Sequence, residues 1–420
     1  MIGIRVAPLL AGILLLSAGA ASAEKTRRVP EDFETINAAI EAAEPGDTIL
    51  VGPGTYAETI VLTDAKGDAL IIKSTDGREK TRIEYVADAN TNEAVVTFQR
   101  CSNSTQFLGF TIDGKGEARR GVLANSDSRP VLENVRVDGC EYGVAAHRTS
   151  VPFLRDVVIT NSRTAALFIT GGSADVKNAR FINGEKYGIY ANTATDILRL
   201  RNVQIEDNGQ IGIQASDAEF ELLDSTVINN GDTGILVQDT SPVIRNVKIA
   251  KHTNIGIVLE ASSARIENCD IRQQEHGLIC SIEGDPIIAK CTFDEAKVYH
   301  IGIEGDANPL IGGSLENANA FLGRPEVALH TSSTAAINAS YNYWGFPCVP
   351  SKALENVGEG KLKRRPWMAP NLSRSFDDCT AARHYYKKWK DGKIDAQGNP
   401  IGPQEALDDN FSPEDDDAGE

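Results

Sequence analysis

Aliphatic and polar residues alternate over short stretches in the middle of the chain, and turn residues interrupt the alternation every few positions. After Gly234, a variable residue separates Ile235 from Val237, which predicts a strand with one buried face. Turn residues follow over 239–242, and two further short strands are predicted over 243–249. No part of this unit has helical periodicity. The pattern therefore predicts three short strands and three turns in each unit.

The unit repeats at a nearly constant interval, marked by a phrase of Gly, an aliphatic residue, a variable residue and a small or apolar residue. The steps between successive phrases are 21 to 25 residues long, typically 22. The phrase begins at Gly121, Gly143, Ala165, Gly188, Gly212, Gly234, Gly256, Gly277 and Gly302. A fixed period of this length is the signature of a stacked repeat protein.

No connection in a unit is long enough for a crossover helix between parallel strands. Each strand must therefore pair with the same strand one unit up or down. This predicts an all-β solenoid, a single-stranded parallel β-helix with coils of about 22 residues that rise about 4.8 Å each.

Asn or Asp recurs 12 to 14 residues after the glycine, just before the third strand. These residues are Asn134, Asp156, Asn178, Asn202, Asn246 and Asn268. They tolerate the left-handed backbone of a sharp corner, so we expect a structural ladder of stacked amides. The inward column after them is predicted to contain small side chains: Val135, Val157, Ala179, Val203, Thr226, Val247, Cys269 and Cys291.

The two ends of the chain depart from the repeat. Residues 1–23 have a charged start, a short apolar core and a closing Ala21-Ser22-Ala23, which predicts a cleaved secretory signal peptide. Residues 33–43 have Phe33, Ile36, Ile40 and Ala43 on one face of a short helix, which would cap the open end of the stack.

We accordingly divide the mature chain into a β-helix over 24–370 and a tail over 371–420. Within the β-helix, 29–62 is the N-terminal cap and first coil, 121–312 the regular coils and 313–370 the closing segment. The tail is basic and aromatic over 383–390 and acidic over 401–420, and we expect it to be partly disordered.

The composition of the chain limits the binding partners and the cellular location that we expect. The formal net charge is −17, which argues against a nucleic-acid partner. Outside the signal peptide no segment is a candidate for a membrane span, so we expect an exported, periplasmic or extracellular protein of undetermined oligomeric state. Seven cysteines are present; Cys269, Cys280 and Cys291 are interpreted as small core residues, whereas Cys348 and Cys379 are able to pair.

Three motifs carry a resemblance to a known family. Phe33–Glu58 contains F-x-T-I-x-x-A-I followed by G-D-T-I-x-V-x-P-G-T-Y-x-E, Leu108–Gly114 reads LGFTIDG, and Asn342–Gly345 reads NYWG, followed by Pro366-Trp367. Over roughly residues 28–370 the chain resembles the right-handed parallel β-helix proteins of the pectin-lyase-like superfamily. The resemblance implies a right-handed helix but no single reaction, because the superfamily includes lyases, glycosidases, esterases, epimerases, adhesins and non-catalytic periplasmic proteins.

The catalytic signatures of this superfamily are missing from the sequence. The motifs of pectinesterases, polygalacturonases and alginate epimerases are not found, and Leu322–Pro325 and Glu275–Gly277 only echo parts of them. Clusters of Met, His or Cys that would handle copper are also lacking. Whether the protein is an enzyme is therefore left open; a polysaccharide lyase is the class that the sequence excludes least.

Two small groups of residues remain as candidate sites. Asp217 and Asp239 lie five residues after their glycines on neighbouring coils, about 5 Å apart, and Glu260 follows on the next coil. They are candidates to bind a cation, Ca²⁺ above all, or a basic ligand.

Tyr190, Gln214 and Gln238, with Leu236 among them, are expected to face outward from the first strand, where amides and a ring suit sugar hydroxyls and faces. The resulting hypothesis is an exported protein that binds or acts on an extended, acidic polysaccharide. The alternative is a non-catalytic periplasmic or cell-surface solenoid, a scaffold or adhesin for a protein partner. A groove with a carboxylate cluster would favour an enzyme, and flat, evenly polar faces would favour the scaffold.

Overall fold

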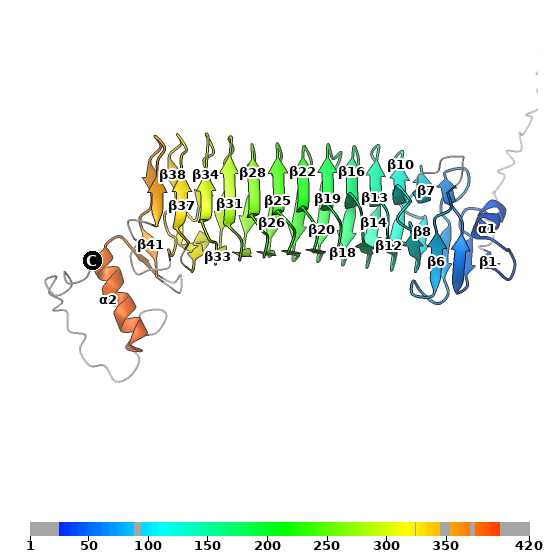
Figure 1. Cartoon of the computed structure of the whole chain (residues 1–420), viewed down its shortest axis with the longest axis horizontal. Helices are drawn as coiled ribbons and strands as arrows, with labels where there is room; N and C mark the ends of the chain where they lie inside the picture. The colour runs from blue at the N-terminus through cyan, green and yellow to red at the C-terminus, as the bar shows by residue number, and fades with distance from the viewer. Residues whose placement is uncertain (1–24, 88–93, 324, 345–352, 370–373, 395–420) are drawn as a thin grey trace, which may run out of the picture.

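Each coil of the chain adds one strand to each of three parallel sheets, as the pattern of short strands and turns predicts (Figure 1). The computed structural model describes residues 25–87, 94–323, 325–344, 353–369 and 374–394. The prediction of a parallel β-helix with coils of about 22 residues is confirmed. We call the three sheets A, B and C.

Sheet A has 15 strands, most of them of three or four residues. They are β1 (Thr26–Val29), β2 (Thr48–Val51), β5 (Ile71–Ser74), β8 (Gln106–Leu108), β11 (Val131–Glu133), β14 (Phe153–Arg155), β17 (Asp175–Lys177), β20 (Leu198–Arg201), β23 (Phe220–Leu223), β26 (Val243–Arg245), β29 (Arg265–Glu267), β32 (Ile287–Ala289), β35 (Leu310–Ile311), β38 (Ile337–Asn338) and β40 (Leu362–Lys363).

Sheet B has 12 strands. They are β3 (Gly54–Ala57), β6 (Thr81–Glu84), β9 (Thr111–Asp113), β12 (Arg136–Asp138), β15 (Val158–Thr160), β18 (Arg180–Ile182), β21 (Gln204–Glu206), β24 (Thr226–Ile228), β27 (Lys248–Ala250), β30 (Asp270–Arg272), β33 (Thr292–Asp294) and β36 (Ala320–Phe321).

Sheet C has 13 strands, and most of them are six residues long. They are β4 (Ile60–Thr63), β7 (Ala94–Gln99), β10 (Arg120–Asn125), β13 (Tyr142–His147), β16 (Ala165–Thr170), β19 (Tyr187–Asn192), β22 (Ile211–Ser216), β25 (Thr233–Gln238), β28 (Ile255–Glu260), β31 (His276–Ser281), β34 (Tyr299–Ile303), β37 (Val327–Thr331) and β39 (Leu354–Asn356).

The core consists of columns of apolar side chains that run along the axis of the β-helix and are enclosed by the three sheets. In sheet C, Ile213 pairs with Ile235 and Ala215 with Val237, so like residues stack from coil to coil. Burial of these columns joins the coils into one continuous cluster that runs the length of the described β-helix. Cys101, Cys140, Cys269, Cys280 and Cys291 are free and buried, which confirms the interpretation of the repeat cysteines as core residues. Cys379 is in a disulfide, and its expected partner Cys348 lies outside the described residues.

The repeated glycine is required by lack of space inside the coil. A Cβ built on Gly234 would lie 2.5 Å from the carbonyl oxygen of Gly256 and 2.6 Å from Nε2 of His252. Contacts this short with backbone atoms are not found for real Cβ atoms, so a side chain there has to displace the neighbouring coil.

Two members of the glycine column were assigned wrongly from the sequence. Tyr142 pairs with Ala165 and Val144 with Leu167, so Ala166 and not Ala165 occupies the column. Gly302 pairs with Ile279 on the outer face, and His300 occupies the column instead. Position 300 is a histidine, and the glycine phrase two residues later, at Gly302, matches the repeat in sequence but lies outside the glycine column.

The corners of the coils rely on left-handed residues, as expected for the Asn column. Asn178, Asn202, Asn246 and Asn268 all have φ between 52 and 57°, as do Asp156 and Asp224. Their side chains are hydrogen-bonded along the axis, for example Asn268 Nδ2 to Asn246 Oδ1 at 2.7 Å. The ladder is therefore confirmed. The column of small inward side chains was predicted to include Thr226, but Thr226 pairs with Gln204, which faces outward. Ser225 is the buried residue of that coil.

A buried polar column lies at the corner before sheet C. Asn208, Asn230 and His252 are stacked, with Asn208 Nδ2 donating to Asn230 Oδ1 at 2.9 Å and the Asn230 backbone N–H donating to His252 Nδ1 at 3.3 Å. His252 Nε2 is 3.1 Å from the Val227 carbonyl oxygen. Only a neutral imidazole satisfies both partners, with its proton on Nε2. Burial lowers the pKa of His252 to about 4, although its hydrogen bonds with Val227 and Asn230 oppose this shift.

Two short helices flank the stack. The helix α1 (Ile36–Ala42) lies beside the first strands at the N-terminal end (Figure 1) and buries Ile36, Ala39 and Ile40 in the main core. That it caps the open end stays a prediction, as do the domain boundaries. At the other end, the 3₁₀ turn η1 (Leu315–Asn317) is followed after the last coils by the antiparallel pair β41 (Trp367–Met368) and β42 (Ser375–Phe376) and by α2 (Cys379–Lys390). Residues 1–24 and 395–420, with the predicted signal peptide and acidic tail, lie outside the described residues.

We predict that Gly234→Ala destabilises the protein by about 2 kcal/mol, because the new methyl group overlaps the next coil. Gly302→Ala is the matched control: its added Cβ would have only ordinary contacts, at 3.6 Å from Ile279 and Tyr299. Urea or thermal unfolding of both variants measures the difference. Equal loss in the two variants would contradict the placement of Gly234 in the inner column and Gly302 on the outer face.

We also predict that the protein loses stability as the pH falls from about 6.5 to about 4. His252 and His300 both have a folded pKa of about 4 because they are buried, against an ordinary value of 6.5. Between these pH values the unfolded chain binds protons that the folded chain does not. The free energy of unfolding therefore falls by up to about 3 kcal/mol for each of the two histidines.

The variant His252→Asn isolates one of these contributions, because Asn occupies the same column on the two preceding coils and does not titrate. Its unfolding midpoint, measured across this pH range, should fall less steeply than that of the wild-type protein. Parallel profiles for the two proteins would show that the folded pKa of His252 is not lowered.

Candidate functional site

The three outer faces of the β-helix differ in chemistry. The outer faces of sheets A and B carry many charged residues, and several of these form ion pairs between neighbouring coils. Examples are Arg155 with Asp175 at 3.0 Å and Arg201 with Glu221 at 3.1 Å. Such rows of oppositely charged side chains are typical of a surface that is exposed to solvent.

The outer face of sheet C is instead apolar and aromatic over many coils. Its central column has few charged members: Leu123, Ala145, Phe168, Tyr190, Gln214, Leu236, Val258, Ile279, Gly302 and His330. The column at the start of the strands adds Tyr142, Tyr187, Ile211, Ile255, His276 and Tyr299. We call these two columns the sheet C stripe. Most of these side chains are half-buried, so the stripe presents a partly exposed apolar surface that Gln214 and Gly302 interrupt; such surfaces are typical of interaction sites.

Rings from three neighbouring coils meet at the N-terminal part of the stripe. Phe168 lies 4.3 Å from Tyr142 and 5.6 Å from Tyr190 between ring centroids, the latter pair stacked with an interplanar angle of 20°. Tyr187 is 5.3 Å from Tyr190, and His147 is 5.6 Å from Phe168. All five side chains are half-buried, so each ring keeps part of its surface open to solvent.

Imidazole and phenol groups gather at the other end of the stripe. Tyr299 is stacked on His330 at 4.8 Å and lies 5.1 Å from His276. His330 Nδ1 is 2.7 Å from Oε2 of Glu355, which fixes the ring and leaves Nε2 for another partner. Burial lowers the pKa of His276, although the charges of Glu275 and Glu304 oppose this. The group therefore combines His276, whose neutral form is favoured, with His330, whose ring is oriented by Glu355.

The three residues proposed from the sequence to contact a glycan all lie on the outer face of sheet C. Tyr190 pairs directly with Gln214, and Gln238 lies in the adjacent column, where its Nε2 donates to Glu260 Oε2 at 2.7 Å. Ser216 Oγ donates to Gln238 Oε1 at 2.9 Å, so a polar row borders the stripe. Sequence reasoning missed Phe168, Tyr299 and His330, because the wrong assignments at Ala165 and Gly302 obscured the register there.

The proposed cation-binding carboxylates are divided between two positions of the coil. Asp217 and Asp239 are exposed corner residues with φ of 48 and 54°, so the turn itself accounts for an Asp at each position. Glu260 pairs with Gln238, one position earlier in its coil. Within the described ranges no group of three or more His, Cys, Asp or Glu is arranged to hold a metal ion. A calcium role for Asp217 and Asp239 stays a prediction.

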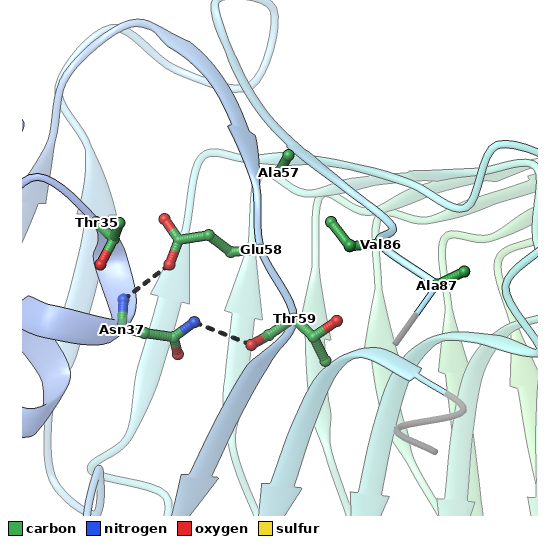
Figure 2. Close-up of a pocket in the computed structure, with 7 residues that line it drawn as sticks. All are labelled: Thr35, Asn37, Ala57, Glu58, Thr59, Val86 and Ala87. Carbon is green, nitrogen blue, oxygen red and sulfur yellow. Dashed lines mark hydrogen bonds between the residues drawn. The ribbon is translucent and has the colours of Figure 1, made fainter. Parts of the chain in front are cut away.

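A cavity of about 520 Å³ lies at the N-terminal end, between the start of α1 and the loop from β3 to β4 (Figure 2). The Glu58 carboxylate in it accepts hydrogen bonds from the backbone N–H groups of Ile36 and Asn37 at 2.9 and 3.0 Å. Asn37 Nδ2 donates to the Thr59 carbonyl at 3.0 Å. Because these groups hold α1 against the first coils, the cavity is structural in character.

Comparison with known proteins agrees with this fold. The family model "Right handed beta helix region" matches residues 120–254 and 233–340, just over half of the chain. The chain belongs to the right-handed β-helix family. No curated protein matches its sequence. Among the described residues, no helix is long and apolar enough to cross a membrane.

Two solved right-handed β-helices illustrate the likeness. The A-module of the Azotobacter vinelandii mannuronan C-5 epimerase AlgE6 has 15% sequence identity and a TM-score of 0.52, over 77% of this chain and 92% of that one. The A-module of AlgE4 from the same organism has 13% identity and a TM-score of 0.50, over 70% and 93%. At this level of identity the likeness is one of fold, as the resemblance in the sequence implied.

Proposed function

We propose that this exported right-handed β-helix binds an extended polysaccharide along the outer face of sheet C. The sheet C stripe carries the proposal, because one face of three is lined with aromatic and aliphatic groups and bordered by amides. Ring faces pack against the apolar faces of sugars, and amides match sugar hydroxyls. The coil rise of about 4.8 Å is close to the length of one sugar unit, so successive coils meet successive units.

The distribution of polar groups favours a sugar chain over a protein partner for this face. The row formed by Ser216, Gln238 and Glu260 runs parallel to the stripe on the three coils that follow the coil of Tyr190, so donors and acceptors continue the face beyond the ring cluster. The two similar structures are mannuronan C-5 epimerases by name, which fits a polysaccharide ligand without identifying it. The predicted signal peptide would take the protein to where extended glycans occur.

We predict that Phe168→Ala combined with Tyr190→Ala weakens polysaccharide binding by about 2 kcal/mol, roughly thirty-fold in Kd, because two stacking rings are lost. The matched control is Phe153→Ala, which removes a half-buried ring that faces outward from sheet A. Affinity electrophoresis and calorimetry against neutral and acidic polysaccharides, with and without EDTA, measure the effect.

Ring stacking needs no metal, so EDTA should leave this binding unchanged. A loss of binding in EDTA would instead favour calcium at Asp217 and Asp239. If the control loses as much affinity as the double variant, or if no polysaccharide is retained, sheet C is not a glycan-binding face.

A second candidate function is acid–base catalysis on the bound chain, favoured by the pairing of His330 with Glu355 beside Tyr299. In a lyase reaction on a uronate, His330 would take the proton from the carbon next to the carboxylate. The glycosidic oxygen would leave with a proton from Tyr299, and a double bond would form in the sugar.

We predict that the protein releases unsaturated product from a polyuronate and that His330→Asn lowers this rate at least about a hundred-fold. Ultraviolet absorbance of the unsaturated uronate follows the reaction. Phe153→Ala, on the outer face of sheet A, is the control and should retain the activity. Equal rates for the protein and a buffer blank on pectate and alginate would restrict the function to binding.

A further inference from the structure

Lys and Arg residues are clustered near the C-terminus, outside the sheet C stripe. Residues 361–369 and 374–394, which we call the basic module, hold ten of the 42 Lys and Arg residues of the chain and three of its 59 Asp and Glu residues. Nine of the ten bases are exposed: Lys361, Lys363, Arg364, Arg365, Arg374, Arg383, Lys387, Lys390 and Lys393. The rest of the chain is acidic, including residues 401–420, which contain eight acids and no base, so the basic module differs in sign from the β-helix and from the tail that follows it.

The basic module is a folded unit and not a loose end of chain. Trp367 in β41 pairs with Phe376 in β42, and Phe376 packs on Tyr385 of α2 at 5.2 Å between ring centroids. The guanidinium of Arg374 lies 5.9 Å from the Phe376 ring and 5.7 Å from the Tyr385 ring. Asp378 caps α2 by accepting from the Ala381 N–H at 3.0 Å. The charged side chains are therefore displayed on a fixed support.

On α2 the bases form one exposed stripe. Arg383, Lys387 and Lys390 follow the i, i+4, i+7 spacing of one helix face, and Tyr386 lies between them, 6.0 Å from the Trp389 ring. None of these three bases forms an ion pair with any residue that the structure describes. Like charges at this spacing repel one another by a few tenths of a kcal/mol per pair. The helix dipole favours the bases of the last turn but not Arg383 or the bases of 361–365.

We propose that the basic module is a docking surface for an acidic polysaccharide, with Arg383, Lys387 and Lys390 binding its anionic groups and Tyr386 and Trp389 packing on its sugar rings. A polyanion relieves the repulsion along the stripe, and the neighbouring rings match a polymer with apolar ring faces. A lipid surface fits less well, because the apolar side chains of α2, Ala382 and Tyr385, are buried in the protein and not free to insert.

This site is separate from the sheet C stripe and does not rest on its function. It also has its own optical signal. Trp344 and Trp367 are buried, at 3% and 4% exposure, whereas Trp389 is 36% exposed. A ligand on α2 should therefore change the intrinsic fluorescence through Trp389 alone, and Trp389→Phe should abolish that change.

The test uses the full chain with Arg383→Gln, Lys387→Gln and Lys390→Gln together, since Gln preserves helix propensity. The control variant has Lys177→Gln, Arg180→Gln and Lys248→Gln, which removes the same charge from exposed positions on sheets A and B. Pectate is the acidic probe and dextran the neutral one, with titrations followed by Trp389 fluorescence and calorimetry between about 50 and about 200 mM salt.

We expect the wild-type protein and the control to bind pectate with an affinity that falls steeply with salt. The α2 triple variant should bind at least about ten-fold more weakly at low salt and depend less on salt, because fewer counterions are released. Dextran should not change the fluorescence of Trp389. The combination of Phe168→Ala and Tyr190→Ala should leave the salt-dependent binding at α2 intact, which separates this site from sheet C.

Three results would overturn the proposal. One is unchanged pectate binding by the α2 triple variant. Another is an equal loss in the control, which would mean that only net charge matters. The third is tighter, Trp389-reported binding of a DNA duplex or of phosphatidylglycerol vesicles than of pectate, which would assign the surface to another class of polyanion.

Discussion

The hydrogen-bonded ladder between successive coils is the interaction on which the rest of the structure depends. Parallel pairing continues only if each coil returns to the same height and angle, so every coil must turn three corners within about the same number of residues. Left-handed residues make these corners possible, and amide side chains such as those of Asn246 and Asn268 bond along the axis. The glycine column serves the same requirement, because a side chain at Gly234 would separate two coils.

This constraint acts on the inward and corner positions and leaves the outward positions free. Inward columns have to match from coil to coil, as Ile213 and Ile235 do, whereas an outward side chain contacts only its neighbours on the same face. A whole face is therefore able to change chemistry without disturbing the stack. The difference between the paired charges of sheets A and B and the rings of sheet C is of this kind, which is why the stripe indicates a function and not a demand of the fold.

Much of the fold followed from the sequence because corner and inward residues obey strict spacing. The strands predicted after Gly234 match β25, β26 and β27, and the corner role of the Asn column was predicted correctly. The wrong assignment at Gly302 comes from a local imitation of the repeat. Gly302 copies the glycine phrase two residues after the true column position, where the imidazole of His300 contributes a hydrogen bond to the Leu322 carbonyl at 2.7 Å.

The outer face was harder to predict because it has no repeating residue type. Tyr190, Gln214 and Gln238 were recognised as outward, but the ring contacts between Phe168, Tyr142 and Tyr190 depend on register across three coils. An error of one residue in one coil hides such a contact completely, since it exchanges inward and outward positions. The proposed cation site shows the same sensitivity, because Glu260 counts as a neighbour of Asp239 in the sequence pattern and as a neighbour of Gln238 in the sheet.

The separation of the two proposed surfaces follows from the geometry of a solenoid. An apolar strip needs coil after coil of uninterrupted sheet, and a high density of unpaired positive charge would be neutralised among the ion-pair ladders of sheets A and B. The basic module begins at β40, the last strand of sheet A, where these ladders end. If both proposed surfaces bind the same acidic polymer, its ring faces would lie on sheet C and its anionic groups on α2. Two weak contacts on one rigid protein then act as a single stronger one, because the second forms at the high effective concentration set by the first.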